Sequence, residues 1–171
     1  MTPPTLLDLE STASRRGLLL RLQVASRGPL TTLRVGVARR SEQALLLLGE
    51  LKGWALPTAD GLRLDTMRVQ GGGESGSTAD VGLLIWAATF AWALEATPCR
   101  QATLLAIRDN DSQHRRLVRY FRRLGFAPLR ELGAGPLDLA PRLLWGGAGL
   151  LMRGDVSDGL ARAWRRLQSP A

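Results

Sequence analysis

Alternation of apolar and polar residues predicts an antiparallel β-meander in the first part of the chain. Residues 17–26 and 30–40 alternate in part and are separated by the turn-like sequence Arg-Gly-Pro. Residues 44–56 form an apolar run typical of a buried strand, and residues 62–69 alternate again after a turn at 58–61 that ends in Asp-Gly. We therefore expect four successive strands before the first long helix.

The pattern changes after residue 70. Residues 70–80 are rich in glycine and serine and predict a loop, with Ser77 or Thr78 as the N-cap of the next helix. An apolar run over residues 81–94 predicts that helix, and it is shorter than the roughly 20 residues that span a bilayer. The run therefore indicates a buried core helix, and no membrane partner is expected.

Strands and helices then alternate. Residues 101–107 predict a short aliphatic strand, and residues 108–113 form a polar loop rich in capping residues. In the helix that follows, Leu117, Phe121 and Leu124 share one stripe, while arginines occupy most of the remaining surface. Gly125 is expected to cap this helix, so that the next strand begins at residue 126.

The last third of the chain predicts a loop at 133–141, a glycine-interrupted strand or hairpin at 142–155, and an amphipathic helix at 156–168. This order predicts an α/β (or α+β) fold, in which a mixed sheet has an N-terminal antiparallel meander and helices packed against it. Residues 1–15 are expected to be a flexible N-terminal tail, and residues 16–171 to form one domain.

The composition argues against disulfide-bonded and metal-centred classes. Cys99 is the one cysteine among 171 residues, so no intrachain disulfide and no cysteine-based metal centre can form. We expect Cys99 to be a buried free thiol, which suits a cytoplasmic protein. His114 is the one histidine, and no metal site is predicted.

The net charge of +8 favours anionic partners. Of the 23 basic residues, all but Lys52 are arginine, a pattern typical of a GC-rich coding sequence, so we attribute some of the positive charge to coding bias. Phosphate-bearing cofactors and nucleic acid are the two classes of partner that such a surface suits. The arginine-rich helix near residue 119 carries the nucleic-acid alternative, although neither groove-reading geometry nor exposed aromatic residues accompany it.

Two segments together resemble the GNAT superfamily of acetyl-CoA-dependent N-acyltransferases. Residues 102–126, ATLLAIRDNDSQHRRLVRYFRRLGF, are similar to that family's strand, polar loop and helix ending in Gly-Phe. Residues 64–69, LDTMRV, look like the central strand that precedes its cofactor loop. The resemblance spans roughly residues 44–132, and it implies a GNAT-like sheet, acetyl-CoA or another acyl-CoA as cosubstrate, and an amine acceptor.

The resemblance implies a cofactor site at the end of that central strand. In the family, the pantetheine arm of acyl-CoA lies where two parallel strands part, and its pyrophosphate rests on the N-terminus of the next helix. Residues 68–73, Arg-Val-Gln-Gly-Gly-Gly, match the family's loop pattern literally, but they lie early in the loop. The residues implied in cofactor binding are Val69, Gly71, Gly73, Gly76, Ser77, Thr78 and Arg115.

The resemblance also implies an acid and a base. The family's tyrosine, which protonates the departing thiolate, falls on Phe121, and Tyr120 lies one place earlier. One residue corresponds to a rotation of about 100° on a helix, so we expect Tyr120 to point away from that position. Tyr120 nevertheless remains the candidate acid, and Asp65 and Glu50 are the candidate bases.

The sequence leaves three functions open. The first is an N-acyltransferase that acts on an unidentified small-molecule or protein amine, and it could be a homodimer. The second is a GNAT-like binding or regulatory module without catalysis, which Phe121 at the tyrosine position and the acidic Glu74 and Asp80 favour. The third is a nucleic-acid-binding protein, and it is the least supported of the three.

Overall fold

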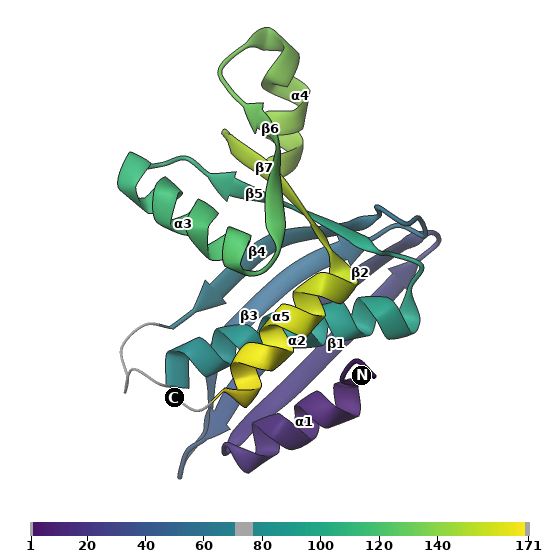
Figure 1. The fold of residues 1–171 in the computed structure, drawn as a ribbon, viewed down its shortest axis with the longest axis vertical. Helices are drawn as coiled ribbons and strands as arrows, with labels where there is room; N and C mark the ends of the chain where they lie inside the picture. The colour runs from purple at the N-terminus through teal and green to yellow at the C-terminus, as the bar shows by residue number, and fades with distance from the viewer. Residues whose placement is uncertain (1, 71–76, 170–171) are drawn as a thin grey trace.

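The computed structural model describes residues 2–70 and 77–169, and Figure 1 shows their arrangement. In these residues, seven strands form one mixed sheet in the order β1-β2-β3-β4-β5-β7-β6, with five α-helices. The predicted α/β class, with its antiparallel meander and helices against the sheet, is confirmed. The strands are β1 Leu18–Arg27, β2 Leu30–Arg40, β3 Leu45–Ala55, β4 Leu62–Val69, β5 Gln101–Ile107, β6 Phe126–Leu132 and β7 Gly149–Asp155.

The meander forms because one side of each strand is apolar. In β2, Leu33, Val35 and Val37 are buried, whereas the residues between them are less buried, so the strand buries one face and exposes the other. β1 and β2 are joined at the pair Arg27 and Leu30, and Gly28 adopts a φ of 58° in this turn. A tight hairpin turn favours glycine in this left-handed region.

The parallel pair of β4 and β5 is short. Their pairing covers only Leu62 to Leu64 on β4 and Ala102 to Leu104 on β5, although both strands continue beyond it. Immediately after Leu64, Asp65 is an extra residue in the β3–β4 register, because Gly53 pairs with Leu64 and Lys52 with Thr66. A β-bulge bends and twists a strand, so β4 turns away from β5 at this point. The sheet therefore opens after Leu64.

The N-terminal segment is not a tail, and that prediction is wrong. Residues Leu6–Arg15 form helix α1, which buries Leu9 and Ala13 against the core. Thr5 caps the helix, since its side chain accepts a hydrogen bond from the Asp8 amide while the Asp8 carboxylate accepts one from the Thr5 amide. The Thr-x-x-Asp signal of this capping box was readable from the sequence.

Helix α2, Ser77–Ala96, is the central helix of the core, as predicted. Every residue from Val81 to Ala93 is buried. Its segment Thr78–Ala96 is long and apolar enough for a membrane span by length and composition alone, with a mean hydropathy of 1.3, but 72% of its most apolar window is buried in the protein. In Figure 1, α1, α2 and α5, Val156–Gln168, lie against the sheet together.

Helix α3, Asp111–Arg123, begins earlier than predicted. Asn110 is its N-cap and accepts hydrogen bonds from the amides of Ser112 and Gln113, so half of the expected polar loop is helical. Gly125 follows the helix with a φ of 98°, a conformation that favours glycine. β6 starts directly afterwards at Phe126, as expected.

Residues 133–141 are not a continuous loop, and residues 142–145 are helical rather than part of a strand, so both of these predictions are wrong. A 3-10 helix, η1 (Pro136–Asp138), leads into helix α4 (Leu139–Trp145), and β7 is one strand rather than a hairpin. Pro136 favours the start of a helix because its φ is fixed, and Gly146 ends α4 with a φ of 79°. The predicted final helix at 156–168 is confirmed as α5.

Candidate functional site

A cavity of about 700 Å³ lies where β4 and β5 part; we call it the inner cavity. Most of its lining residues belong to β4, β5, α2 and α3, with one residue each from β3 and α5. Most of its lining is apolar, which suits the burial of an uncharged ligand arm. The lining residues are Leu51, Leu64, Asp65, Thr66, Met67, Val69, Thr78, Ala79, Gly82, Leu83, Trp86, Leu104, Leu105, Ile107, Leu117, Tyr120, Phe121 and Arg166.

Tyr120 lines the inner cavity, contrary to the expectation that it points away. Its hydroxyl oxygen accepts a hydrogen bond of 2.8 Å from the Trp86 indole N–H. Burial raises the pKa of Tyr120 above its usual value of 10.0, and this effect is opposed by the Trp86 hydrogen bond and by the charge of Arg166. The phenol therefore stays protonated at neutral pH, and its O–H remains available to a ligand.

Glycine at position 82 makes room for this hydroxyl. A Cβ built on Gly82 would lie 3.3 Å from the Tyr120 Oη and 3.8 Å from the Met67 Cε. Phe121 also lines the inner cavity, but its ring belongs to the aromatic core, where it packs edge-on against Trp86, at 6.0 Å between centroids, and against Phe126. Tyr120 and Phe121 thus divide two roles, because one reaches the cavity with its hydroxyl and the other anchors α3.

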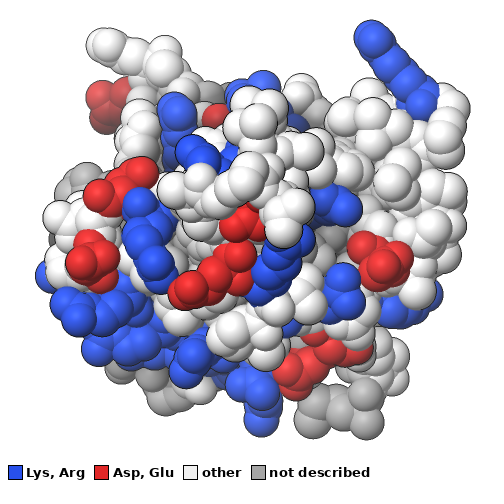
Figure 2. Space-filling view, turned by 90° about the horizontal axis from the view of Figure 1, so that it is seen from above, with Lys and Arg blue, Asp and Glu red and all other residues white. Residues whose placement is uncertain are grey.

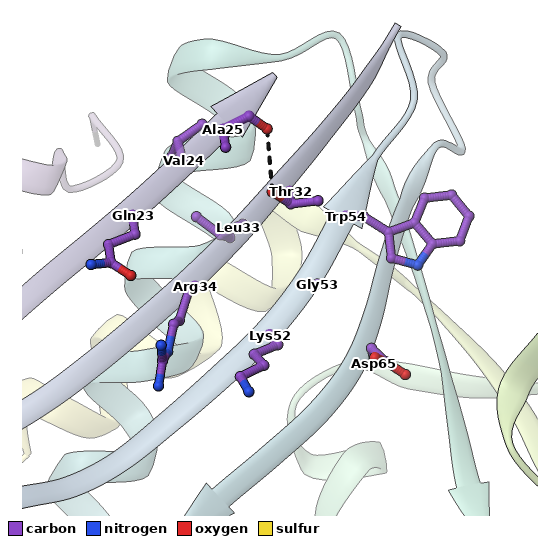
Figure 3. Close-up of a pocket in the computed structure, with 10 residues that line it drawn as sticks. All are labelled: Gln23, Val24, Ala25, Thr32, Leu33, Arg34, Lys52, Gly53, Trp54 and Asp65. Carbon is purple, nitrogen blue, oxygen red and sulfur yellow. Dashed lines mark hydrogen bonds between the residues drawn. The ribbon is translucent and has the colours of Figure 1, made fainter. Parts of the chain in front are cut away.

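A second depression of about 400 Å³ lies on the face of the meander that points away from α1 and α2; we call it the outer hollow. Figure 3 shows its residues on β1, β2, β3 and β4. Asp65, the bulge residue, lines both the inner cavity and the outer hollow. Asp65 therefore lies where the two spaces meet, beside the opening between β4 and β5.

Glu50 does not share this position. Its carboxylate accepts hydrogen bonds from the Arg34 guanidinium, with a shortest distance of 2.7 Å, and it lies 4.0 Å from the Lys52 ammonium. The hydrogen bond from Arg34 holds the pKa of Glu50 below its usual value, against the opposing effect of burial. A carboxylate held in its charged form by an arginine is a weak base, and Glu50 lines neither the inner cavity nor the outer hollow.

The ion pair between Glu50 and Arg34 should make the stability of the protein depend on pH. Because the pKa of Glu50 is lowered in the folded protein, its contribution is present above the unfolded-state pKa and is lost as the pH falls through the folded value. We expect thermal unfolding of Glu50→Gln to depend less on pH between about 5 and 3 than that of the wild type. Equal pH slopes for the two proteins, measured by circular dichroism, would contradict the assignment.

Only some of the predicted cofactor-binding residues lie at the inner cavity. Val69 and Thr78 line the inner cavity, and Ser77 is the first residue of α2. Gly71, Gly73 and Gly76 lie outside the described residues. Arg115 is exposed on α3 and is not among the residues that line the inner cavity.

Arg16 neutralises the acidic side chain near the start of α2. Its guanidinium lies 3.0 Å from the Asp80 carboxylate, and it also donates a hydrogen bond to the Leu167 carbonyl at the end of α5. The sequence alone suggests that Asp80 would repel a phosphate at this helix end. The ion pair reduces that repulsion, because the carboxylate is compensated locally.

His114 and Cys99 have structural contacts. The imidazole of His114 is buried and lies 3.2 Å from the Ile107 carbonyl, to which its Nδ1–H can donate. The Cys99 thiol is buried, as predicted, and donates to the Leu56 carbonyl. Within residues 2–70 and 77–169, no three His, Cys, Asp or Glu side chains are grouped so that they could hold a metal ion.

Sequence reasoning missed several residues of the inner cavity. Gly82 and Trp86 follow the predicted Thr78 at intervals of four along α2, and this spacing places the three residues on one face of a helix. A glycine within that face was a readable sign of close approach by another group. Met67 and Arg166 carried no such sign, because only the tertiary fold brings them to the cavity.

The charged surface is mixed where Figure 2 shows it. On the face seen from above, acidic side chains lie among the basic ones. The arginines of α3 that are exposed, and that form no ion pair with any described residue, are Arg115, Arg116, Arg119, Arg122 and Arg123.

No protein-family model matches the chain, and no curated protein matches it.

Proposed function

We propose that the protein is an acyl-CoA-dependent N-acyltransferase of the GNAT type. The single observation that carries this proposal is the early end of the β4–β5 pairing at Leu64 and Leu104, with an apolar cavity at the opening. Beyond Leu64, no strand among residues 2–70 and 77–169 pairs with the β5-facing side of β4, so its backbone groups there can bind a ligand. An extended ligand with amide groups can pair with them as an added strand would.

The pantetheine arm of acyl-CoA meets these requirements. It is uncharged and extended, and it carries two amides, so it suits a mostly apolar cavity of about 700 Å³ with strand backbone on one side. Thr78 lies at the cavity beside the N-terminal turn of α2, where the helix dipole favours the pyrophosphate. Arg166 adds a positive charge at the same cavity.

The reaction we propose uses Asp65 and Tyr120. The acceptor enters from the outer hollow as an ammonium and first loses one proton to solvent, so that its nitrogen has a free lone pair. This nitrogen then attacks the thioester carbonyl carbon, and Asp65 accepts its second proton. The C–S bond then breaks and an amide forms. Tyr120 donates its phenolic proton to the departing thiolate and regains one from solvent. The products are the N-acyl amine and free CoA.

Calorimetric titration tests the proposed function. We expect CoA and acetyl-CoA to bind the wild type with dissociation constants of roughly 1–100 μM. Gly82→Leu should weaken this binding by at least about tenfold, since the new side chain projects toward Tyr120 and Met67 across the cavity. No heat of binding at millimolar CoA for the wild type would contradict the proposal.

Gly82→Ala is the matched control for this titration. Its single Cβ would lie 3.3 Å from a hydroxyl that can shift, so it should weaken CoA binding less than Gly82→Leu does. Circular dichroism melts of both variants report whether α2 is intact. Equal losses of binding for the two variants would indicate a helix defect rather than an occupied cavity.

A second candidate is a GNAT-like module that binds acyl-CoA without catalysis. The burial of Phe121 in the aromatic core favours this candidate. Phe121 occupies the position of the family's tyrosine, and its side chain has no polar atom that could donate a proton. Binding of acetyl-CoA without release of free CoA, across a broad panel of amines, would support this candidate over the enzyme.

A further inference from the structure

We propose that the acceptor is an amine that also carries a carboxylate or similar anionic group, and that the outer hollow holds it. This inference rests on the proposed function, because it names the substrate class for the same reaction. The arrangement of charge in the outer hollow carries the inference. Cations lie on β2 and β3, and the carboxylate of Asp65 lies on β4.

The cationic side of the hollow has an excess of positive charge. Arg34 is bound to Glu50, with its nitrogens at 2.7 and 2.8 Å from one carboxylate oxygen. Lys52 lies 4.0 Å from Glu50 and forms no hydrogen bond with any described residue. The Glu50 carboxylate therefore neutralises only one of the two positive charges, and the N–H groups of the Lys52 ammonium can donate hydrogen bonds to a ligand.

Asp65 lies apart from these cations. Figure 3 shows the side chains of Arg34 and Lys52 extending toward one end of the outer hollow, while the Asp65 carboxylate turns away from them. No ion pair joins Asp65 to any described residue. A ligand ammonium is therefore expected beside Asp65, next to the opening that leads to the inner cavity.

The register sets the distance between the two charges of the ligand. Lys52 pairs with Thr66, so Asp65 is one residue from the partner of Lys52 on the neighbouring strand. Cross-strand neighbours of this kind lie about 5–8 Å apart at Cβ. An ammonium and a carboxylate separated by a few bonds match this spacing, as in a small amino acid.

The hollow also disfavours other amines. A diamine would bring a second ammonium toward Lys52 and Arg34, and like charges repel. An amine without an anionic group would leave the Lys52 ammonium with only its 4.0 Å contact to Glu50. The remaining wall is formed by Trp54 together with aliphatic side chains of β1 and β2, and Trp54 is itself covered by the Arg63 guanidinium at 5.1 Å. The outer hollow of about 400 Å³ suits a small ligand rather than a folded protein surface.

Matched amine series test this inference in an assay for released CoA with acetyl-CoA as donor. The amines are glycine, β-alanine and 4-aminobutanoate, the carboxamide of each, and 1,4-diaminobutane. We expect at least one carboxylate amine to exceed its carboxamide by about tenfold in kcat/KM, as one charge-assisted hydrogen bond allows. Lys52→Gln should reduce this preference to within about threefold, mainly through KM, while the substitution of an exposed arginine of β2, Arg39→Gln, should keep it.

The outcomes separate the two proposals. If acetyl-CoA binds but the carboxamides or the diamine are used as well as the carboxylate amines, or no carboxylate amine is used, the acceptor class is wrong and the cofactor site stands. A preference for carboxylates that persists in Lys52→Gln also overturns the inference. If acetyl-CoA does not bind at all, the proposed function fails first, and the calorimetric titration identifies that case.

Discussion

Asp65→Asn is expected to lower kcat/KM by about 10²- to 10⁴-fold, the range that a positioned general base contributes. Asn keeps the size and shape of Asp but cannot accept a proton from the attacking amine. Asp65 is the residue that lines both the inner cavity and the outer hollow, and the bulge places it directly after the last β4–β5 pair. We expect acetyl-CoA binding to change little, because Asp65 is not needed for the pantetheine to pair with β4.

Glu50→Gln is the matched control for Asp65→Asn. It makes the same chemical change one strand away, on a carboxylate that is already held by Arg34. We expect kcat of Glu50→Gln to stay within a few-fold of the wild type. If Glu50→Gln lost more activity than Asp65→Asn, the base would be Glu50 and the assignment here would be wrong.

Tyr120→Phe is expected to lower kcat by about 10²-fold, at the lower end of what proton transfer contributes. The substitution removes one oxygen, which accepts the Trp86 indole N–H and has a proton to give. Because burial raises the pKa of Tyr120, that proton is retained at every pH below about 10. Any loss of wild-type activity caused by ionisation of Tyr120 should therefore appear only above pH 10.

The leaving group provides the control for Tyr120→Phe. An aryl thioester releases a thiolate of low pKa that needs no proton, so the acid contributes little to its departure. We expect the Tyr120→Phe defect to shrink toward a few-fold with such a donor. An equal defect with acetyl-CoA and with the aryl thioester would mean that Tyr120 has a structural role through Trp86 rather than an acid role.

The meander and the last helix were predictable from sequence because their apolar spacing is regular. Residues 30–40 and 156–168 coincide with β2 and α5, since one buried face imposes a period of two on a strand and of 3.6 on a helix. The α1 helix was predicted as a flexible tail, because its burial of Leu9 and Ala13 depends on packing against elements that are distant in sequence. Its capping box at Thr5 and Asp8 was the stronger signal.

The position of Tyr120 could not be predicted from helical rotation alone. The helical rotation gives the direction in which the Cα–Cβ bond of Tyr120 leaves α3. The contacts of its hydroxyl depend on the neighbouring helix α2. Gly82 leaves space on α2, and Trp86 supplies a donor, so Tyr120 reaches the inner cavity from a neighbouring rotational position. The role of Asp65 was similarly hidden, because a β-bulge depends on the register with β3 and not on local sequence.

Amide hydrogen exchange, measured by NMR with and without CoA, tests the central claim most directly. If the parted strands hold the pantetheine, saturating CoA should slow exchange by about tenfold or more at amides of residues 65–69 and 105–107 that face the opening. Unchanged exchange in both segments, or protection confined to the arginine face of α3, would contradict the account.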